Sequence, residues 1–412
     1  MEMLERREIA SRRAEELRER ISDYLEYSRN VLTGFSEWDK MQERQEKIKL
    51  ILGASEKEWK DWKWQLRNRI SDEEALAKII PLSSQEKEDI ALTGRKFRWA
   101  GLPYYLSLID PNNPLDPVRM QTIPTIKEYY DDSGEMDPMA EEYTSPVSAI
   151  TRRYPDRLII NVTNQCANYC RHCQRRRNIG EVDHQTSRED LEEAIQYIAN
   201  HSEIRDVLLT GGDALMLSDD TLDWLLTELD NIPHVEIKRL GTRAPVVIPY
   251  RVTEELCEVL GRHLPLFVHT HFNHPLEITP AAKEACWTLA RQGINLGNQA
   301  VLLKGINNHP HLMKKLNHEL LKIMVKPYYI FHAKGVRGTG HFRTRVEEGI
   351  EIMEKLRGYT SGIAIPTYIV NAPRGCGKTP MLPEYLVSMG ADKLFIRTWE
   401  NRVLEYENNE DL

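Results

Sequence analysis

The feature that most constrains the fold is a regular alternation of strand and helix patterns between residues 157 and 370. Short apolar runs typical of buried strands are separated by amphipathic segments that begin at capping residues such as Ser187, Thr253 and Thr279. Strand–helix units repeated at this spacing require parallel strands joined by crossover helices. The expected strands are residues 158–163, 206–210, 236–241, 266–271, 295–303, 328–332 and 367–370.

Two parallel architectures fit this alternation, an open doubly wound sheet and a (β/α) barrel. No glycine-rich dinucleotide fingerprint follows the first strand. Polar residues and glycines instead follow the strands at their carboxyl ends, where (β/α) barrels carry their active sites. The sequence therefore predicts an α/β fold built on a complete or partial (β/α) barrel.

The N-terminal segment, residues 1–95, is highly charged, poor in glycine and proline, and carries apolar residues at helical spacing. It predicts a helical arm. The arm contains three tryptophans whose large apolar side chains should be shielded from solvent, Trp59, Trp62 and Trp64. This favours a role in oligomerisation over a solvated extension.

The other segments have different compositions. Residues 96–150 are rich in proline and aspartate and predict an irregular connection over the barrel surface. The barrel is assigned to residues 151–373 and a small C-terminal extension to residues 374–412. Within the extension we expect strands at 393–397 and 402–406 and a disordered acidic end at 407–411.

Composition limits the possible partners. The net charge of -8 argues weakly against nucleic acid. No apolar run has membrane-spanning length, and the charged amino terminus lacks the apolar core of a signal peptide. We therefore expect a cytoplasmic homo-oligomer (dimer or tetramer) with no nucleic-acid or membrane partner and with reduced thiols.

Three cysteines, Cys166, Cys170 and Cys173, follow the first expected strand in the pattern C-x3-C-x2-C. Three thiolates can hold three irons of a four-iron cluster and leave the fourth iron free for another ligand. Structural zinc would need four ligands, usually in paired C-x2-C units, and a disulfide would leave one cysteine unpaired. The spacing therefore favours a [4Fe-4S] cluster with one open coordination site.

Other strand ends carry residues that could face the same barrel mouth. Gly211, Gly212 and Asp213 follow the second strand, where paired glycines either allow close approach of a ligand or form a simple turn. His271 and Gln299 lie at the ends of the fourth and fifth strands. Each alone would more often be a satisfied core residue, but their shared position also suits ligand contact.

Lys378 lies on a glycine-rich loop, Gly375-Cys376-Gly377-Lys378-Thr379, that looks like the end of a phosphate-binding P-loop. The full P-loop pattern fails at Ala372, and Pro380 disfavours a following helix. A lysine in this setting suits a Schiff base with pyridoxal phosphate (PLP), although spacing alone leaves a purely electrostatic role open.

Arginines cluster on both sides of the first strand, at Arg153 and Arg157 before it and at residues 175–177 after the cysteines. A solvated basic run is the simpler interpretation. A phosphate and an amino-acid carboxylate would, however, both need arginines for bidentate contact.

Together these motifs resemble the lysine 2,3-aminomutase family of PLP-dependent radical S-adenosylmethionine (SAM) enzymes, over about residues 50–405. The resemblance rests on residues 153–157, 166–177, 209–214, 270–275, 297–299, 340–344 and 377–380. It implies a partial (β/α)6 barrel, a [4Fe-4S] cluster, SAM and PLP as cofactors, and an external one-electron reductant of the flavodoxin or ferredoxin type.

The resemblance also assigns roles to residues. Lys378 would bind PLP, Arg153 and Arg157 its phosphate, and Arg175 the substrate α-carboxylate. The cluster ligands would be Cys166, Cys170 and Cys173. The SAM contacts would be Gly211, Gly212, Asp213, His271 and Gln299.

Two departures from the lysine-acting members bear on the substrate. Lys334 and Asn371 stand where those members carry aspartates that bind the distal ammonium, so the far end of the site should accept a carboxylate. This pattern resembles that of members acting on glutamate, which move the 2-amino group to C3 and give β-glutamate (3-aminoglutarate). The second departure is that no cysteine follows Cys376, whereas lysine-acting members carry a cysteine cluster near the carboxyl terminus that holds zinc. The resemblance therefore implies no structural zinc here.

Three alternatives remain open from the sequence. One is an isomerase of the same kind acting on lysine, arginine or another amino acid. Another is a radical SAM enzyme without PLP, and the third is an iron–sulfur protein with a structural or electron-transfer role.

Overall fold

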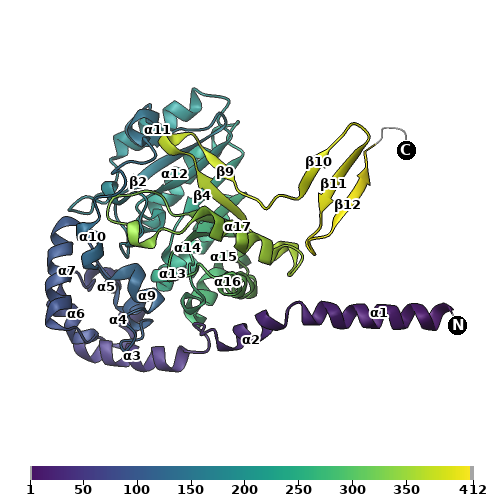
Figure 1. Cartoon of the computed structure of the whole chain (residues 1–412). Coiled ribbons are helices and arrows are strands. Elements are labelled where there is room, and N and C mark those ends of the chain that lie inside the picture. The colour runs from purple at the N-terminus through teal and green to yellow at the C-terminus, as the bar shows by residue number, and fades with distance from the viewer. Residues whose placement is uncertain (1, 409–412) are drawn as a thin grey trace.

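The computed structural model describes residues 2–408, and its centre is a nine-stranded sheet whose strands follow chain order from β1 to β9. The strands from β2 to β8 pair in parallel (Figure 1). Short antiparallel strands close its two edges, β1 (Ile150–Thr151) and β9 (Lys378–Pro380). The parallel strands are β2 (Arg157–Thr163), β3 (Asp206–Gly211), β4 (Ile237–Gly241), β5 (Leu266–Thr270), β6 (Asn295–Leu302), β7 (Lys326–His332) and β8 (Thr367–Asn371).

One main helix follows each strand from β2 to β7. The capping residues Ser187, Thr253 and Thr279 accept backbone hydrogen bonds at three of the helix starts, as the sequence predicts. The helices are α11 (Arg188–Ala199), α12 (Asp219–Asp230), α14 (Glu254–Gly261), α15 (Pro280–Arg291), α16 (Pro310–Lys322) and α17 (Val346–Leu356). Within the described residues the two sheet edges do not pair with each other, so the prediction of a partial (β/α)6 barrel is confirmed, with β8 as a seventh parallel strand.

Alternation along the strands separates the outer core from the barrel interior. In β2, Leu158, Ile160 and Val162 are buried in the main hydrophobic core. Ile159 points to the other face, where it lines an interior cavity. Burial of each large aliphatic side chain stabilises the fold by about 1.5–3 kcal/mol, so the barrel wall is held from its outer face.

The N-terminal helices form a lobe beside the barrel, and α1 extends away from it (Figure 1). Trp59 and Trp64 are buried in the main core of the same chain, and Trp62 packs against it. Neighbouring segments of the same chain therefore cover these tryptophans, so they do not support a role of the arm in oligomerisation, and that role stays a prediction. The helices are α1 (Glu2–Glu19), α2 (Ser22–Asn30), α3 (Trp38–Leu52), α4 (Glu56–Lys60), α5 (Trp62–Arg67), α6 (Glu73–Ile79) and α7 (Ser84–Lys96).

The segment 96–150 is more ordered than its composition predicts. It contains three short helices, α8 (Pro103–Ser107), α9 (Pro117–Thr122) and α10 (Ile126–Tyr130). Pro103 and Pro117 occupy the first helical position, where proline starts a helix instead of breaking it. Tyr104 and Tyr105 are fully buried and bond to Thr279 and Glu277, so the segment packs into the barrel loops.

The C-terminal extension forms a separate antiparallel sheet that projects from the barrel (Figure 1). Its strands are β10 (Leu386–Met389), β11 (Lys393–Arg397) and β12 (Val403–Glu407), of which β10 is not predicted from the sequence. The expected disordered end falls partly on residues 409–412, outside the described residues, and Glu407 belongs to β12. Among the described helices, none has the length and apolar character of a membrane span.

Candidate active site

Two adjoining cavities lie in the barrel. The first, the cysteine cavity, is lined by the three cysteines and by Gly211, Gly212, Asp213, His271, Gln299, Arg175 and Lys334. The second, the lysine cavity, is lined by Lys378, Arg153, Arg157 and Asn371, and again by Arg175, His271, Gln299 and Lys334. Every site residue predicted from the sequence thus lies on one of two cavities that share a wall.

The cysteine loop connects β2 to α11, and its three thiols are free and half-buried. Burial raises the pKa of the Cys166 and Cys173 thiols, so a bound cation would be needed to hold them as thiolates. Within residues 2–408 no three His, Cys, Asp or Glu side chains converge on a point suited to one metal ion. A four-iron cluster does not need such convergence, because each cysteine binds a different iron. The thiol set therefore fits a cluster.

A buried ion-pair network holds this loop in place. The Arg171 guanidinium, only 1% exposed, pairs with the fully buried Glu128 carboxylate of α10 at 2.7 Å. Arg176 pairs with the same carboxylate at 2.8 Å. Burial opposes the charge on Glu128, but the two arginines outweigh it and lower its pKa, so the loop rests on an ionised carboxylate.

We expect Glu128→Ala to reduce the free energy of unfolding by about 3–5 kcal/mol, because it leaves two arginines buried without a counter-charge. Anaerobic urea unfolding followed by circular dichroism measures the change. Glu74→Ala is the control, since that exposed carboxylate pairs with Lys87 at the surface and should matter little. Equal losses in the two variants would contradict the importance of the buried network.

The glycines after β3 are required by backbone packing. A Cβ atom on Gly211 would lie 2.5 Å from the Thr163 carbonyl oxygen, and one on Gly212 would lie 2.2 Å from the Gln165 oxygen. These glycines therefore press the end of β3 against the start of the cysteine loop. Asp213 accepts hydrogen bonds from the backbone N–H groups of Leu215 and Arg243, at 3.0 and 2.7 Å, and so links two barrel loops.

His271 and Gln299 lie next to each other on the wall that the cavities share. The Nδ1 atom of His271 is 2.9 Å from the Gln299 backbone oxygen, which makes it a donor. Burial lowers the pKa of His271 to about 4. The imidazole is therefore neutral at pH 7, with its second nitrogen free to accept a hydrogen bond.

Lys378 begins the edge strand β9, opposite Asn371 of β8. This placement excludes the P-loop alternative, because a P-loop lysine starts a helix. The backbone N–H of Lys378 donates to the Tyr154 hydroxyl at 2.9 Å, and its Nζ atom lies 4.9 Å from the centre of the Tyr329 ring. Burial, followed by the charges of Arg239 and Arg157, lowers the pKa of Lys378 to about 8. A larger share of neutral amine makes this lysine a better nucleophile.

The lysine cavity contains two buried donors that have no hydrogen-bond partner. The Asn371 side-chain Nδ2 and the Arg153 Nη1 are buried and have no hydrogen-bond partner. The Lys334 ammonium bonds to the Gln174 side-chain oxygen. Burial, together with Arg153 and Arg175, lowers the pKa of Lys334 to about 7. Unpaired buried donors beside three cations favour the binding of anions.

Glu141 is a site residue that the sequence does not reveal. It lies on a 3-10 helix in the segment predicted to be irregular, and its carboxylate contacts Arg175 and Arg177 at 3.2 Å and Arg153 at 3.6 Å. Burial raises its pKa, but Arg175 and Arg153 together lower it below the usual value, so it is ionised. No spacing pattern marks it. The structure also adds Tyr154, Gln174, Arg239 and His269 to the cavity walls.

A partial parallel barrel with three cysteines on the loop after its first strand defines the radical SAM class. The family described as "Radical SAM superfamily" matches residues 160–315, and the family described as "Lysine-2,3-aminomutase" matches residues 353–412. The chain is 56% identical over 406 residues to glutamate 2,3-aminomutase of Clostridioides difficile, which covers 98% of this chain and 96% of the relative. It is 49% identical to L-lysine 2,3-aminomutase of Clostridium subterminale, with 87% of each chain covered, and 44% identical to that of Bacillus subtilis, with 91% and 80% covered.

The chain therefore belongs to the lysine 2,3-aminomutase family of radical SAM enzymes. Its cofactors are a [4Fe-4S] cluster, SAM and PLP, and it is an isomerase whose substrate is a small molecule, an amino acid. Membership excludes the alternatives of a PLP-free radical enzyme and of a structural or electron-transfer iron–sulfur protein.

Proposed function

We propose that the enzyme moves the 2-amino group of L-glutamate to C3 and gives β-glutamate. The observation that carries this proposal is that Lys334 and Asn371 both line the cavity that contains Lys378. An ammonium and an unpaired amide N–H2 together satisfy a carboxylate, and they would repel an ammonium. The 56% identity to a glutamate 2,3-aminomutase supports the same substrate.

In this proposal the charges of the cavity position the two ends of the substrate. Arg175 binds the α-carboxylate, and Lys334 with Asn371 binds the γ-carboxylate. Glu141 holds the Arg175 Nε at 3.2 Å and so leaves the terminal nitrogens free for the substrate. A substrate whose two carboxylates are both bound presents a fixed C2–C3 bond to the cysteine cavity.

In this proposal the same two cavities hold the cofactors. Cys166, Cys170 and Cys173 hold the cluster, and the SAM contacts are Gly211, Gly212, Asp213, His271 and Gln299. Arg153 and Arg157 take the PLP phosphate, and the unpaired Nη1 of Arg153 suits that role. When bound, the cluster and SAM supply the radical that removes hydrogen from C3, and PLP supplies the π-system that lets nitrogen migrate.

The proposal also includes an external one-electron donor of the flavodoxin or ferredoxin type and a homo-oligomeric assembly. Both of these parts of the proposal rest on the family resemblance alone.

The direct test is anaerobic incubation of the reconstituted enzyme with L-glutamate, SAM, PLP and dithionite, with the product identified by NMR. We expect β-glutamate to form and to require all three cofactors. Absence of β-glutamate, with β-lysine formed from L-lysine under the same conditions, would overturn the substrate assignment.

The reaction should depend on pH through Lys334. Its ammonium binds the γ-carboxylate only when protonated, so kcat/KM for glutamate should be full below its pKa and fall as the pH rises through it. This profile reports the enzyme before substrate binds, with the PLP phosphate on Arg153. That anion raises the pKa of Lys334 above about 7, so the fall belongs between about pH 7 and the ordinary lysine value of about 10.4. In Lys334→Arg the fall should disappear, because the guanidinium stays charged. An unchanged pH profile in that variant would contradict the role of Lys334.

The role of Lys378 as the residue that binds PLP can be tested without measuring turnover. Borohydride reduction of the PLP-loaded protein should attach PLP to Lys378, and Lys378→Ala should lose the adduct. Peptide mass spectrometry locates it. The Cys376→Ala variant, two residues away and exposed, should keep full labelling. An adduct on any other lysine would refute the assignment.

A further inference from the structure

A buried arginine bonds to one of the three cluster cysteines. Arg243 follows β4, is 7% exposed, and donates from Nη1 to the Cys170 sulfur at 2.7 Å. Among the described residues no other side chain donates a hydrogen bond to Cys166, Cys170 or Cys173. The three cysteines therefore have different surroundings, and one of them faces a fixed cation.

The guanidinium of Arg243 is held from several directions. Its Nη2 donates to Glu277 at 2.6 Å, to Gln121 at 2.7 Å and to the Tyr105 hydroxyl at 2.9 Å. Its Nε donates to the His271 backbone oxygen at 3.2 Å. The side chain therefore cannot swing away from the sulfur without breaking several buried hydrogen bonds, each costly to leave unmade.

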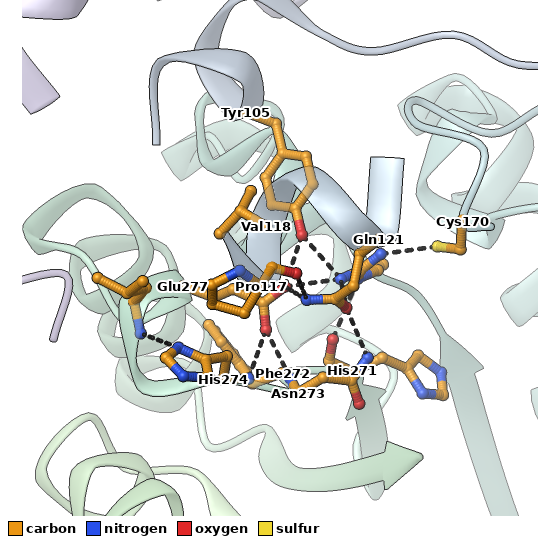
Figure 2. A network of polar contacts seen from close by, with 12 residues as sticks. Tyr105, Pro117, Val118, Gln121, Cys170, His271, Phe272, Asn273, His274 and Glu277 are labelled. Atoms are coloured by element: carbon orange, nitrogen blue, oxygen red, sulfur yellow. Dashed lines mark hydrogen bonds and ion pairs between the residues drawn. The ribbon is translucent and has the colours of Figure 1, made fainter. Parts of the chain in front are cut away.

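The partner carboxylate is equally fixed. Glu277 is fully buried, and its second oxygen accepts from the backbone N–H groups of Asn273 and His274, at 2.6 and 2.9 Å. Figure 2 shows Glu277 at one end of this network and Cys170 at the other. The negative charge is thus held away from the sulfur, on the Nη2 side, while the Nη1 donor contacts the sulfur directly.

We propose that Arg243 is a positioning residue that raises the reduction potential of the cluster through its hydrogen bond to Cys170. The inference rests on the proposed ligation by the three cysteines. Reduction adds one electron, supplied by the external donor, and takes the [4Fe-4S] cluster from the 2+ to the 1+ state. A cation at the sulfur stabilises the more negative, reduced state, and a hydrogen bond to a ligand sulfur is a known determinant of cluster potential.

The segment 96–150 fixes the position of the Arg243 guanidinium. Tyr105 and Gln121 come from α8 and α9, so the segment 96–150 holds the guanidinium against the cysteine loop. A buried arginine can also be purely structural. Arg251 is such a case among the described residues, since it is 1% exposed, pairs with Asp219 at 2.7 Å and donates no hydrogen bond to a cluster cysteine.

The experiment is a redox titration of the reconstituted cluster, without SAM, monitored by electron paramagnetic resonance. Arg243→Gln should reduce the ratio of reduced to oxidised cluster at a fixed potential about tenfold, which is a fall of about 59 mV for one electron. Arg243→Lys keeps the charge but cannot make all the bonds, so its potential should lie between those of Arg243→Gln and the wild type. Arg251→Lys is the matched control and should leave the potential unchanged.

Two results would overturn the inference. One is a variant Arg243→Gln that retains a full cluster at the wild-type potential, and the other is an equal shift in Arg251→Lys. Lack of a four-iron cluster in the wild type would instead refute the proposed ligation. If Arg243→Gln fails to fold, a measurement on the wild-type protein tests the inference instead. In protein labelled with 15N in its arginine guanidinium groups, pulsed electron paramagnetic resonance of the reduced cluster should detect a coupling to 15N. Absence of this coupling would refute the contact between Arg243 and the Cys170 sulfur.

Discussion

Replacement of any one of Cys166, Cys170 and Cys173 by alanine is expected to abolish SAM cleavage. Three thiolates are the minimum set for a cluster with one open iron, so no ligand is spare. The readout is 5′-deoxyadenosine formed from SAM under dithionite, together with the iron content of the protein. Borohydride trapping of PLP at Lys378 should survive, because that lysine lies on a different element, β9.

The matched control is Cys286→Ala. Cys286 is a buried free cysteine of α15, outside both cavities, so this variant should lose stability without losing the cluster. A single variant in the C-x3-C-x2-C loop that still cleaves SAM at the wild-type rate would contradict the cluster assignment.

The second large effect concerns Lys334 and Asn371 in the lysine cavity. The double variant Lys334→Asp and Asn371→Asp should destroy turnover of glutamate, since it replaces two donors with two carboxylates. A like-charge pair about 4 Å apart at an effective dielectric of 20 costs about 4 kcal/mol, or roughly a thousandfold in kcat/KM. Lysine should be admitted weakly, because Gln174 and the pocket length are unchanged.

The readout is kcat/KM for glutamate and for lysine, measured in the wild type and in the double variant. Lys304→Asp with Asn308→Asp is a control of the same chemistry on residues that line neither cavity. A double variant at 334 and 371 that still prefers glutamate would remove these residues from the recognition of the substrate.

The barrel could be predicted because its strands carry their own signal. The strands have apolar centres between capped helices, such as residues 207–209 of β3 and 266–268 of β5, and their bounds are predicted to within a residue or two. The edge strands β1 and β9 are two and three residues long, too short for any periodicity. The composition of the segment 96–150 does not predict its helices, because proline and aspartate are typical of loops, whereas Pro103 starts α8 and Asp116 with Pro117 starts α9.

The candidate site could be predicted only where its residues lie in compact motifs. The cysteine loop and the lysine loop are local patterns, and parallel strands bring their ends together. Arg243 and Gln121 are 122 positions apart, and Arg175 and Glu141 are 34 apart across a segment with no regular pattern. Such contacts depend on how the segment 96–150 folds against the barrel, which no local spacing encodes.

The most direct test of the central claim is one competition experiment. Reconstituted wild-type enzyme is given equal concentrations of L-glutamate and L-lysine at pH 7 under anaerobic conditions, and the two β-amino acid products are quantified by mass spectrometry. Their ratio is the ratio of the two kcat/KM values. The charge of the Lys334 ammonium predicts an excess of β-glutamate of roughly a thousandfold. Comparable amounts of β-glutamate and β-lysine would contradict the assignment of glutamate as the substrate.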